Sequence, residues 1–298
     1  MNGPAPFADR LAALVEERRS QVCLGLDPDP AALASTPSGE APAPDSPATA
    51  AAAAVAAHCR DLIEAAGPAC VAVKPQLACF ERLGAPGWEA LAATVEAAHG
   101  AGLLVIADGK RGDVPHTAAA YAQALFGSVE TPFGEVAGLG ADAATANPLL
   151  GGDALDPLVA AARATGAGVF ALVRTSNPGA ADLFDLPVGD GSLSERLARL
   201  VAERAPRLAG ASGLSGMGAV VGATEPVHLG RLRELMPDSI FLVPGVGAQG
   251  GSPSDLSPAF ADHPASALIA ASRSLAGAPD PGEAADRLRA QIWDVSRA

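Results

Sequence analysis

The sequence is poor in positive charge. Its 298 residues include 20 lysines and arginines against 33 acidic residues, which gives a formal net charge of −13 at pH 7. No Lys/Arg-rich run occurs, and this argues against a nucleic-acid-binding surface. An acidic protein that binds an anionic ligand must concentrate its few cations locally. Each Lys or Arg at the end of a predicted strand is therefore a candidate for a binding site.

Long hydrophobic runs and recognisable metal or disulfide spacings are also absent. No apolar stretch approaches the ~20 residues that a membrane-spanning helix needs, and residues 7–19 predict an amphipathic helix rather than a secretory leader. The four cysteines form no CxxC pair and fit no metal-ligand spacing, and the histidines are scattered. We therefore expect a soluble, cytoplasmic protein without a bound metal, a membrane partner or a disulfide framework.

What the sequence does contain is a recurring pattern of short apolar segments. Hydrophobic residues make up 49% of the chain, which is enough for a large core. Eight apolar segments predict strands, and each but the first is followed directly by a helical pattern; they are residues 21–26, 70–73, 103–107, 143–146, 168–173, 219–221, 240–243 and 267–270. Eight such units indicate an α/β protein, a single-domain (β/α)8 barrel (TIM barrel) with an N-terminal helix and surface insertions. No GxGxxG follows the first strand, which counts against a dinucleotide-binding fold.

Some segments are expected to fall outside the regular barrel pattern. Residues 34–47 are rich in Pro, Ala and Ser and predict a surface insertion. Residues 77–98 predict one continuous helix, residues 127–141 a short helix near 132–137, and residues 178–191 a long polar loop. The large aromatic residues expected in the core are Trp88, Tyr121 and Trp293.

The carboxyl ends of the strands are where chemistry sits in barrels of this kind. The residues predicted at those ends are Asp27, Lys74, Asp108 with Lys110, Asn147, Ser176 with Asn177, Thr224, Gly247 with Gln249, and Arg273. This set contains no glutamate base, no pair of histidines and no trio of carboxylates that could hold a metal. A cluster of lysines and aspartates therefore has to supply any chemistry.

The densest part of this set lies in residues 103–117, LLVIADGKRGDVPHT. The uninterrupted apolar run predicts a strand buried on both faces. Because side chains alternate along a strand, Asp108 and Lys110 are expected on the same side, and Asp113 falls in the loop that follows. One interpretation is that charges at a strand end simply meet water. The other is a catalytic site, and the spacing alone leaves both open.

Taken together, these motifs resemble the orotidine 5'-phosphate decarboxylase family. The family pattern is a lysine at the end of the second strand, here Lys74 in VAVKP, and D-x-K-x-x-D after the third, here DGKRGD. The resemblance covers essentially the whole barrel and looks strongest toward the longer bacterial branch, judged by ADGKRGD, RTSNPG, PGVGAQGG and ASR. D-x-K-x-x-D alone is shared by related phosphate-sugar barrels. The addition of Lys74, the glycine loop and Arg273 makes the combination specific.

The resemblance implies a lyase that decarboxylates orotidine 5'-monophosphate to UMP without a cofactor, the last step of de novo pyrimidine nucleotide synthesis. Loss of CO2 leaves a carbanion at C6 of the pyrimidine, with no cofactor to accept the electrons. Lys110 is expected to stabilise that charge and then to donate a proton. Asp108 and Asp113 would keep Lys110 charged, and Lys74 would do the same for Asp108 and hold it in place.

Binding roles follow from the same resemblance. Asp27 is expected to accept a ribose hydroxyl, and Ser176 and Asn177 to contact the pyrimidine amide. Asp113 and Thr117 would reach the neighbouring subunit's site, which implies a homodimer. The residues expected to hold the phosphate, at the loops after the last two strands, are Gly247, Gln249 and Arg273.

Two alternatives remain. A metal-dependent barrel that acts on a keto-sugar phosphate by decarboxylation or aldol chemistry shares D-x-K-x-x-D, but it places an acidic metal ligand where Lys74 stands. A lysine at that position would repel Mg²⁺. A non-catalytic phosphate-binding barrel would bind its ligand without turnover, but it has no need of a buried Lys-Asp-Lys array.

Overall fold

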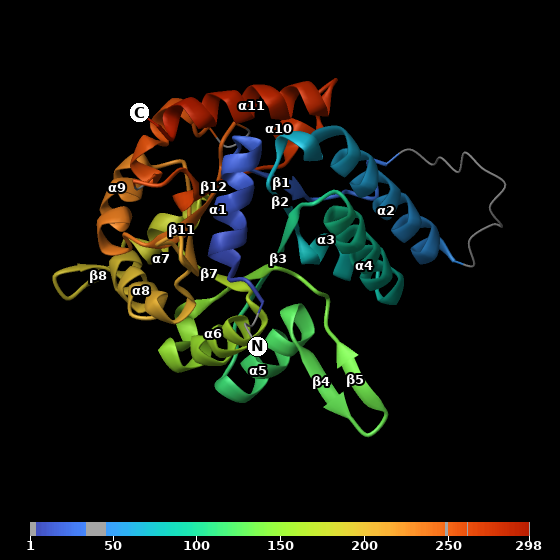
Figure 1. Ribbon diagram of the computed structural model, residues 1–298, viewed down its shortest axis with the longest axis horizontal. Coiled ribbons are helices and arrows are strands. Elements are labelled where there is room, and N and C mark those ends of the chain that lie inside the picture. The colour runs from blue at the N-terminus through green and yellow to red at the C-terminus, as the bar shows by residue number, and fades with distance from the viewer. Residues whose placement is uncertain (1–3, 34–45, 248–249, 261, 298) are drawn as a thin grey trace.

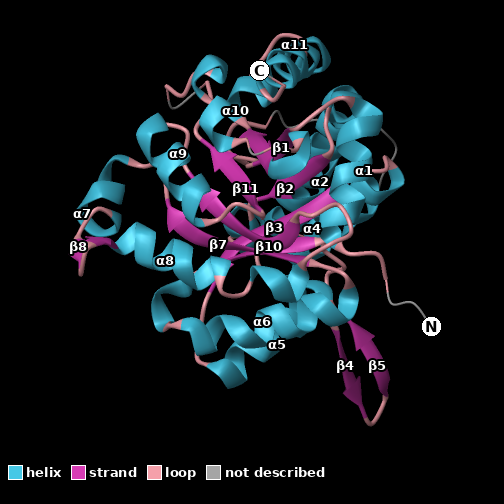
Figure 2. Cartoon of the chain, turned by 60° about the vertical axis from the view of Figure 1, so that its left-hand side comes forward, coloured by secondary structure: helices cyan, strands magenta, loops and turns pink. Residues whose placement is uncertain are grey.

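The computed structural model describes residues 4–33, 46–247, 250–260 and 262–297. Within these ranges eight parallel strands close into a barrel, in the ring order β1-β12-β11-β10-β7-β6-β3-β2 (Figure 2). In chain order the barrel strands are β1 (Val22–Leu26), β2 (Ala72–Pro75), β3 (Leu104–Arg111), β6 (Ala143–Ala146), β7 (Gly168–Arg174), β10 (Ser215–Val221), β11 (Ser239–Pro244) and β12 (Ala267–Ala271). The predicted (β/α)8 barrel is confirmed.

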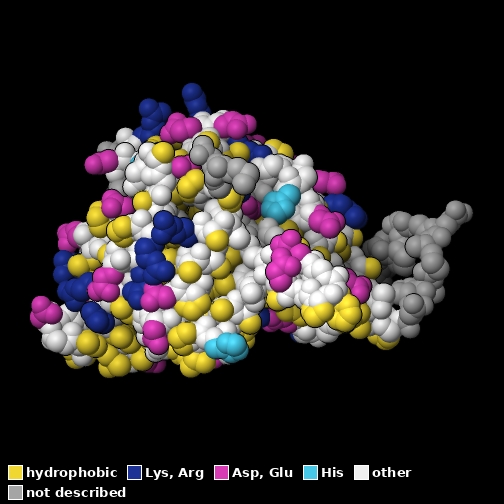
Figure 3. Space-filling model, turned by 60° about the horizontal axis from the view of Figure 1, so that its bottom comes forward, with side chains coloured by type: hydrophobic (Ala, Val, Ile, Leu, Met, Phe, Trp, Pro, Cys, Tyr) yellow, Lys and Arg dark blue, Asp and Glu magenta, His cyan; other side chains and the backbone are white. Residues whose placement is uncertain are grey.

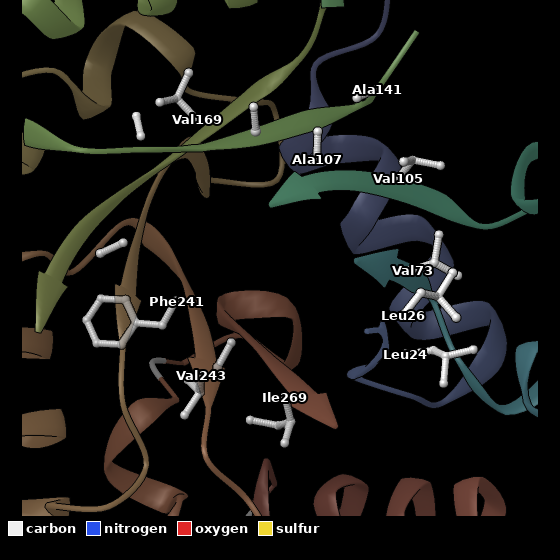
Figure 4. Packing of buried hydrophobic residues seen from close by; sticks show 14 of the residues in the cluster. Leu24, Leu26, Val73, Val105, Ala107, Ala141, Val169, Phe241, Val243 and Ile269 are labelled. Carbon is white, nitrogen blue, oxygen red and sulfur yellow. The ribbon is translucent and has the colours of Figure 1, made fainter. Parts of the chain in front are cut away.

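Helices surround the ring of strands (Figure 1). The longer ones are α2 (Pro47–Ala66), α4 (Ala85–Gly100), α5 (Pro115–Phe126), α6 (Gly152–Thr165), α8 (Leu193–Ala202), α9 (Pro226–Leu235) and α11 (Pro281–Val295). Their apolar faces and the outward side chains of the strands form one large cluster, part of which is shown in Figure 4. Because the strands are covered on both faces, their burial is nearly continuous, as the apolar runs of the sequence predicted.

An N-terminal helix, α1 (Phe7–Arg18), closes the amino-terminal end of the barrel. Phe7 and Leu11 join the cluster formed by inward-facing strand side chains. The ring of Phe7 meets the ring of Phe170 edge-on, with 5.8 Å between centroids. One end of the barrel is thus plugged with apolar side chains, and only the carboxyl end of the strands remains for polar groups.

The predicted single helix over residues 77–98 is wrong. The chain instead forms a short helix, α3 (Leu77–Glu81), and then α4, with Gly84 between them at φ +69°. Gly84 precedes the first residue of α4, and its positive φ, which glycine adopts at little cost, is not helical, so the helix is interrupted there. Trp88, predicted in the core, is instead 44% exposed. Tyr121 and Trp293 are only partly buried.

Two further segments differ from their predictions. The predicted short helix within residues 127–141 is replaced by an antiparallel hairpin, β4 (Ser128–Thr131) with β5 (Gly134–Ala137). Gly134 has φ +114° in its turn, which no helix accommodates. The hairpin projects from the barrel (Figure 1). Residues 178–191, predicted as a loop, contain a short helix, α7 (Ala181–Phe184), and β8 (Pro187–Val188), which pairs with β9 (Gly191–Ser192).

The surface carries mixed charge. On the face shown in Figure 3, basic side chains lie among acidic and exposed apolar ones. No helix in the described ranges has the length and apolar character needed to cross a bilayer. The insertion predicted at 34–47 lies almost wholly outside the described residues, and its last two positions begin α2, where the Ser46 side chain accepts a hydrogen bond from the Thr49 N–H.

Candidate active site

A cavity of about 270 Å³ opens at the carboxyl ends of the barrel strands. Because parallel strands of a barrel all end on the same rim, residues far apart in the sequence meet there. The predicted site residues that line this cavity are Asp27, Lys74, Asp108, Lys110, Ser176, Asn177 and Arg273. The structure therefore gathers most of the residues that the sequence analysis selected into one place.

Other predicted residues do not line this cavity. Asp113 and Thr117 lie before and within the first turn of α5, and the Asp113 carboxylate accepts a hydrogen bond from the Val114 N–H at 2.8 Å. Within the described part of one chain, Asp113 makes no ion pair with Lys110. Gly247 also lies off the cavity, although Gly245 lines it. Two remaining strand-end residues that do not line it are Asn147 and Thr224, and Gln249 lies outside the described residues.

The Asp108 carboxylate is the centre of the site. It is buried at the end of β3, and each of its oxygens faces one lysine. Lys74 Nζ donates to Oδ2 at 2.6 Å, and Lys110 Nζ donates to Oδ1 at 2.7 Å. Two more donors complete the set: Thr145 Oγ1 to Oδ1 at 2.9 Å and Gln76 Nε2 to Oδ2 at 3.3 Å. Four donors match the acceptor capacity of a carboxylate, so its position is fully determined by hydrogen bonds.

The charges of this cluster stabilise one another. Burial alone would raise the pKa of Asp108, but the ammonium groups of Lys74 and Lys110 and their hydrogen bonds outweigh it and lower that pKa to about 2. Burial likewise disfavours the charged form of Lys74, but Asp108 and the more distant Asp27 raise the pKa of Lys74 above its ordinary value. At neutral pH the site therefore presents an ionised pair of Asp108 and Lys74, with the Lys110 side chain on the second carboxylate oxygen.

The backbone conformation of Lys110 is unusual, and it directs the side chain toward Asp108. The prediction that Asp108 and Lys110 share one side holds for their tips, but simple alternation is not the cause. The pairing of β3 with β6 shifts between Ala107 and Arg111, and Lys110 lies at φ +48°, in the left-handed region. Such bulges redirect side chains beside active sites. Here the bulge points the Lys110 ammonium back at Asp108 and leaves it at the cavity wall, with the side chain 41% exposed.

The opposite wall of the cavity is suited to an anion. Arg273, the first residue of α10 (Arg273–Ala276), lines it together with Ser272 and Ser274. Arg273 forms no ion pair with any described carboxylate, so its guanidinium is available. The loop that follows β11 has Gly245 at φ +104° and Gly247 at φ +75°, conformations that favour glycine and let backbone N–H groups approach a ligand closely.

A third part of the wall is formed by Ser176 and Asn177 after β7. Arg174 at the end of β7 connects the two sides of this loop. Its buried guanidinium donates to both oxygens of Asp185, which follows α7, at 2.9 and 3.0 Å. Gly222 passes so close that an added Cβ would lie 2.7 Å from Ser176 Cα. The segment 178–191 and the end of β10 therefore position the loop that the sequence predicted to contact a pyrimidine.

Two residues of the cluster were missed by the sequence analysis. Thr145 stands alone among alanines in β6, and Gln76 follows the Lys74-Pro75 pair. Thr145 is the one polar side chain in an otherwise apolar strand, and that was the available signal. Both residues touch Asp108 only because the barrel closes.

The described residues contain no group of three or more His, Cys, Asp or Glu side chains placed to hold a metal ion.

Lys74 and Lys110 are the only lysines in the sequence, since every other basic side chain is arginine or histidine. Both lysines contact the same carboxylate, that of Asp108.

Comparison with known proteins agrees with this geometry. The model of the orotidine 5'-phosphate decarboxylase / HUMPS family matches residues 20–288. A curated orotidine 5'-phosphate decarboxylase of Rhodopirellula baltica is 42% identical over 273 residues, 90% of this chain and 87% of the relative. That of Deinococcus radiodurans is 40% identical over 90% of this chain and 88% of the relative.

Solved structures lead to the same family. OMP decarboxylase of Leishmania donovani superposes with a TM-score of 0.76 at 37% identity, covering 98% of this chain and 100% of the other. A putative orotidine 5'-phosphate decarboxylase of Streptomyces avermitilis gives a TM-score of 0.80 at 34% identity, covering 100% and 98%. The chain therefore belongs to the orotidine 5'-phosphate decarboxylase / HUMPS family.

Proposed function

We propose that this chain is a carboxy-lyase that converts orotidine 5'-monophosphate to UMP and CO2 in pyrimidine nucleotide synthesis. The observation that carries the proposal is the buried Asp108 carboxylate held between Lys74 and Lys110, at the wall of a cavity that is also lined by Arg273, an arginine without an ion pair to any described carboxylate. The curated relatives at 40% identity and above carry this activity in their names. The enzyme is a decarboxylase that draws its catalytic groups from the protein itself.

The chemistry centres on Lys110. When the bond between C6 and the carboxylate breaks, CO2 leaves and the electron pair remains on C6. The Lys110 ammonium stabilises that charge and then transfers one proton to C6, which gives UMP and a neutral amine that recovers its proton from water. A cation and an acid are needed at one point, and a lysine held by Asp108 supplies both.

Asp108 has a second effect on the substrate. Next to the substrate carboxylate it would repel a like charge, by about 4 kcal/mol at ~4 Å with an effective dielectric constant of ~20. That is small against the ~20 kcal/mol that an enzyme of a very slow reaction removes from the barrier. Lys110 supplies a charge effect of similar size and proton transfer in addition, so its contribution is the larger. Lys74 and Gln76 serve to hold Asp108 beside it.

The remaining wall residues bind the nucleotide. Asp27 accepts a hydrogen bond from a ribose hydroxyl, and Ser176 with Asn177 recognises the pyrimidine amide. The phosphate is bound by the charged fork of Arg273 and by backbone N–H groups of the glycine loop at Gly245 and Gly247, with Gln249 as an additional donor. Phosphate contacts far from the reacting carbon supply binding energy that is used at the ring.

The active form is a homodimer in which Asp113 and Thr117 reach the partner's cavity. Among the described residues the Asp113 carboxylate has its neighbouring N–H as its one hydrogen-bond partner. Val114, Leu149 and Leu150 are exposed apolar residues, at 55%, 48% and 47%. A mixture of K110A and D113A chains tests this arrangement. Each hybrid dimer has one site with both residues intact, so random exchange restores about a quarter of wild-type activity. Mixtures that stay inactive after subunit exchange contradict a shared site.

We place the reaction in the cytoplasm. All four cysteines are free thiols, and three of them (Cys23, Cys59 and Cys70) are buried, as expected in a reducing compartment.

The deciding experiment follows the absorbance of orotidine 5'-monophosphate as purified enzyme is added, with and without EDTA. Turnover that survives the chelator supports the proposal. Turnover of a keto-sugar phosphate that is lost with EDTA would instead identify the metal-dependent alternative. Tight UMP binding without turnover would identify a phosphate-binding protein. Lys74 argues against the first alternative, because it stands where that class places an acidic metal ligand.

A further inference from the structure

Thr145 lies beside β3, the strand that carries both Asp108 and Lys110. It lies in β6, its side chain is buried, and it lines the cavity wall. Its hydroxyl is within hydrogen-bond distance of two groups of β3: the Asp108 carboxylate and the backbone N–H of Lys110, each at 2.9 Å. One side chain therefore contacts both the carboxylate of Asp108 and the backbone of Lys110, the two residues of the proposed catalytic pair.

The direction of both hydrogen bonds is determined by chemistry. A backbone N–H can only donate, so the Thr145 oxygen accepts from Lys110. An ionised carboxylate can only accept, so the single hydroxyl proton goes to Asp108 Oδ1. The hydroxyl has no proton left for a ligand. Its function is thus directed at the protein rather than at the substrate.

The position of Thr145 matches an interruption of the sheet. Ala107 pairs with Ala144, and the next pair is Arg111 with Ala146. Residues 108–110 of β3 therefore stand opposite the single residue Thr145 of β6. The bulge deprives the Lys110 N–H of a carbonyl partner in the ladder, and the threonine hydroxyl takes the place of that partner.

Lys110 needs this support because its backbone is strained. At φ +48° it is one of two non-glycine residues with positive φ among those described, and the other, the exposed Arg19, is the C-cap of α1. A left-handed conformation of a residue with a side chain persists only when its surroundings enforce it. The surroundings here are the bond from its N–H to Thr145 and the bond from its ammonium to Asp108.

We propose that Thr145 is a positioning residue for the decarboxylation: through one hydroxyl it holds Lys110 in its left-handed conformation and orients Asp108, so that the ammonium meets C6 of the substrate. The inference rests on the proposed function. Thr145 touches neither the reacting carbon nor the leaving CO2. It acts by keeping the proton donor where the carbanion forms, and a displacement of about 1 Å there is costly in rate.

Replacing Thr145 by valine tests the proposal with little change in shape. T145V keeps the β-branch and loses both hydrogen bonds. We expect kcat to fall about 10- to 100-fold, the effect of losing hydrogen bonds to a charged pair in the transition state. KM for orotidine 5'-monophosphate and the Kd of UMP should change less than about threefold, because the residues proposed to bind the nucleotide, Asp27, Ser176 and Arg273 among them, are unchanged. T145S restores the hydroxyl and should recover most of kcat.

The two lysines of the sequence provide a second readout. In protein labelled with 15N only at lysine, the backbone amide spectrum holds one signal from Lys74 and one from Lys110. In T145V the Lys110 amide proton should shift upfield and exchange faster with solvent, because its acceptor is gone. The Lys74 amide should stay in place, and T145S should resemble the wild type. General destabilisation would move both signals.

The results of these experiments distinguish failure of the Thr145 proposal from failure of the proposed function. A wild-type enzyme that does not decarboxylate orotidine 5'-monophosphate contradicts the proposed function. An active wild type with T145V within about twofold of its kcat contradicts only the role of Thr145. The role of Thr145 is also contradicted if T145S is as slow as T145V, or if the chemical shift of the Lys110 amide proton is unchanged in T145V. Should T145V fail to fold, T145A is compared with T145S by the same criteria.

Discussion

Replacement of Lys110 by alanine removes a cation and a proton donor at once, and the structure allows the two losses to be estimated separately. A unit positive charge ~4 Å from the developing carbanion, at an effective dielectric constant of ~20, is worth about 4 kcal/mol, or about a thousandfold in rate. General acid catalysis adds about 10²- to 10⁴-fold. We therefore expect K110A to lower kcat by about five orders of magnitude or more.

Nucleotide binding should survive the same change. Arg273, Ser176 and Asp27 line other parts of the cavity and remain in place. The Kd of UMP, measured by calorimetry, should rise by no more than about tenfold, whereas kcat is measured from the absorbance change of orotidine 5'-monophosphate. Equal losses in UMP affinity and in kcat would contradict the assigned role, as would a K110A enzyme within tenfold of the wild-type kcat.

Two matched variants sharpen the test. K110R keeps a cation but gives up its proton far less readily, so it should regain part of the electrostatic contribution without the acid catalysis. K110G removes the same groups as K110A but suits a backbone at φ +48°, so it should be more stable than K110A by about 1 kcal/mol in urea unfolding. A K110R enzyme no faster than K110A would show that charge alone contributes nothing.

Three further predictions concern the surroundings of this lysine and the barrel wall. Because the charges of Lys74 and Lys110 lower the pKa of Asp108 from 3.8 to about 2 despite burial, the carboxylate adds about 2 kcal/mol to the free energy of unfolding above pH 4, and this is lost as the pH falls toward 2. The stability difference between wild type and D108N in urea should therefore shrink over that interval. R273A should weaken UMP binding about 10- to 100-fold and leave uridine binding unchanged in calorimetry, because only the phosphate loses its fork. R233M should lower the free energy of unfolding by about 3 kcal/mol, measured in urea, and leave kcat unchanged. The reason is that buried Arg233 donates to the carbonyl oxygens of residues 236, 239, 259 and 266, and its guanidinium carbon lies 3.7 Å from the centre of the Phe241 ring.

Each of these three predictions can be contradicted by a specific result. A stability difference between wild type and D108N that stays constant from pH 5 to about 2 would mean that the carboxylate is not held by its lysines in the folded state. Equal loss of UMP and uridine affinity in R273A would place the phosphate elsewhere. An R233M barrel as stable as the wild type would show that the carbonyl groups find other donors.

Much of this molecule could be predicted from local sequence. The apolar runs at 70–73, 103–107 and 267–270 are short, unbroken and bounded by charge or glycine, which is enough to predict buried parallel strands and hence the barrel. The charges directly after them had to lie on one rim, so Lys74, Asp108 and Arg273 could be placed together before any coordinates. The failures were local too: Gly84 ends a helix that continuous periodicity suggested, and residues 128–137 contain too short a pattern to separate helix from hairpin.

The sequence by itself determined which residues carry charge and at which strand ends they stand, because hydrophobic periodicity is a property of neighbours along the chain. Only the tertiary structure decided how those charges meet. Lys74 and Thr145 lie 34 and 37 residues from Asp108, and both touch it because β2, β3 and β6 are adjacent in the closed ring. The left-handed backbone of Lys110 comes from a register shift between two strands, and such a shift exists only once the strands have paired.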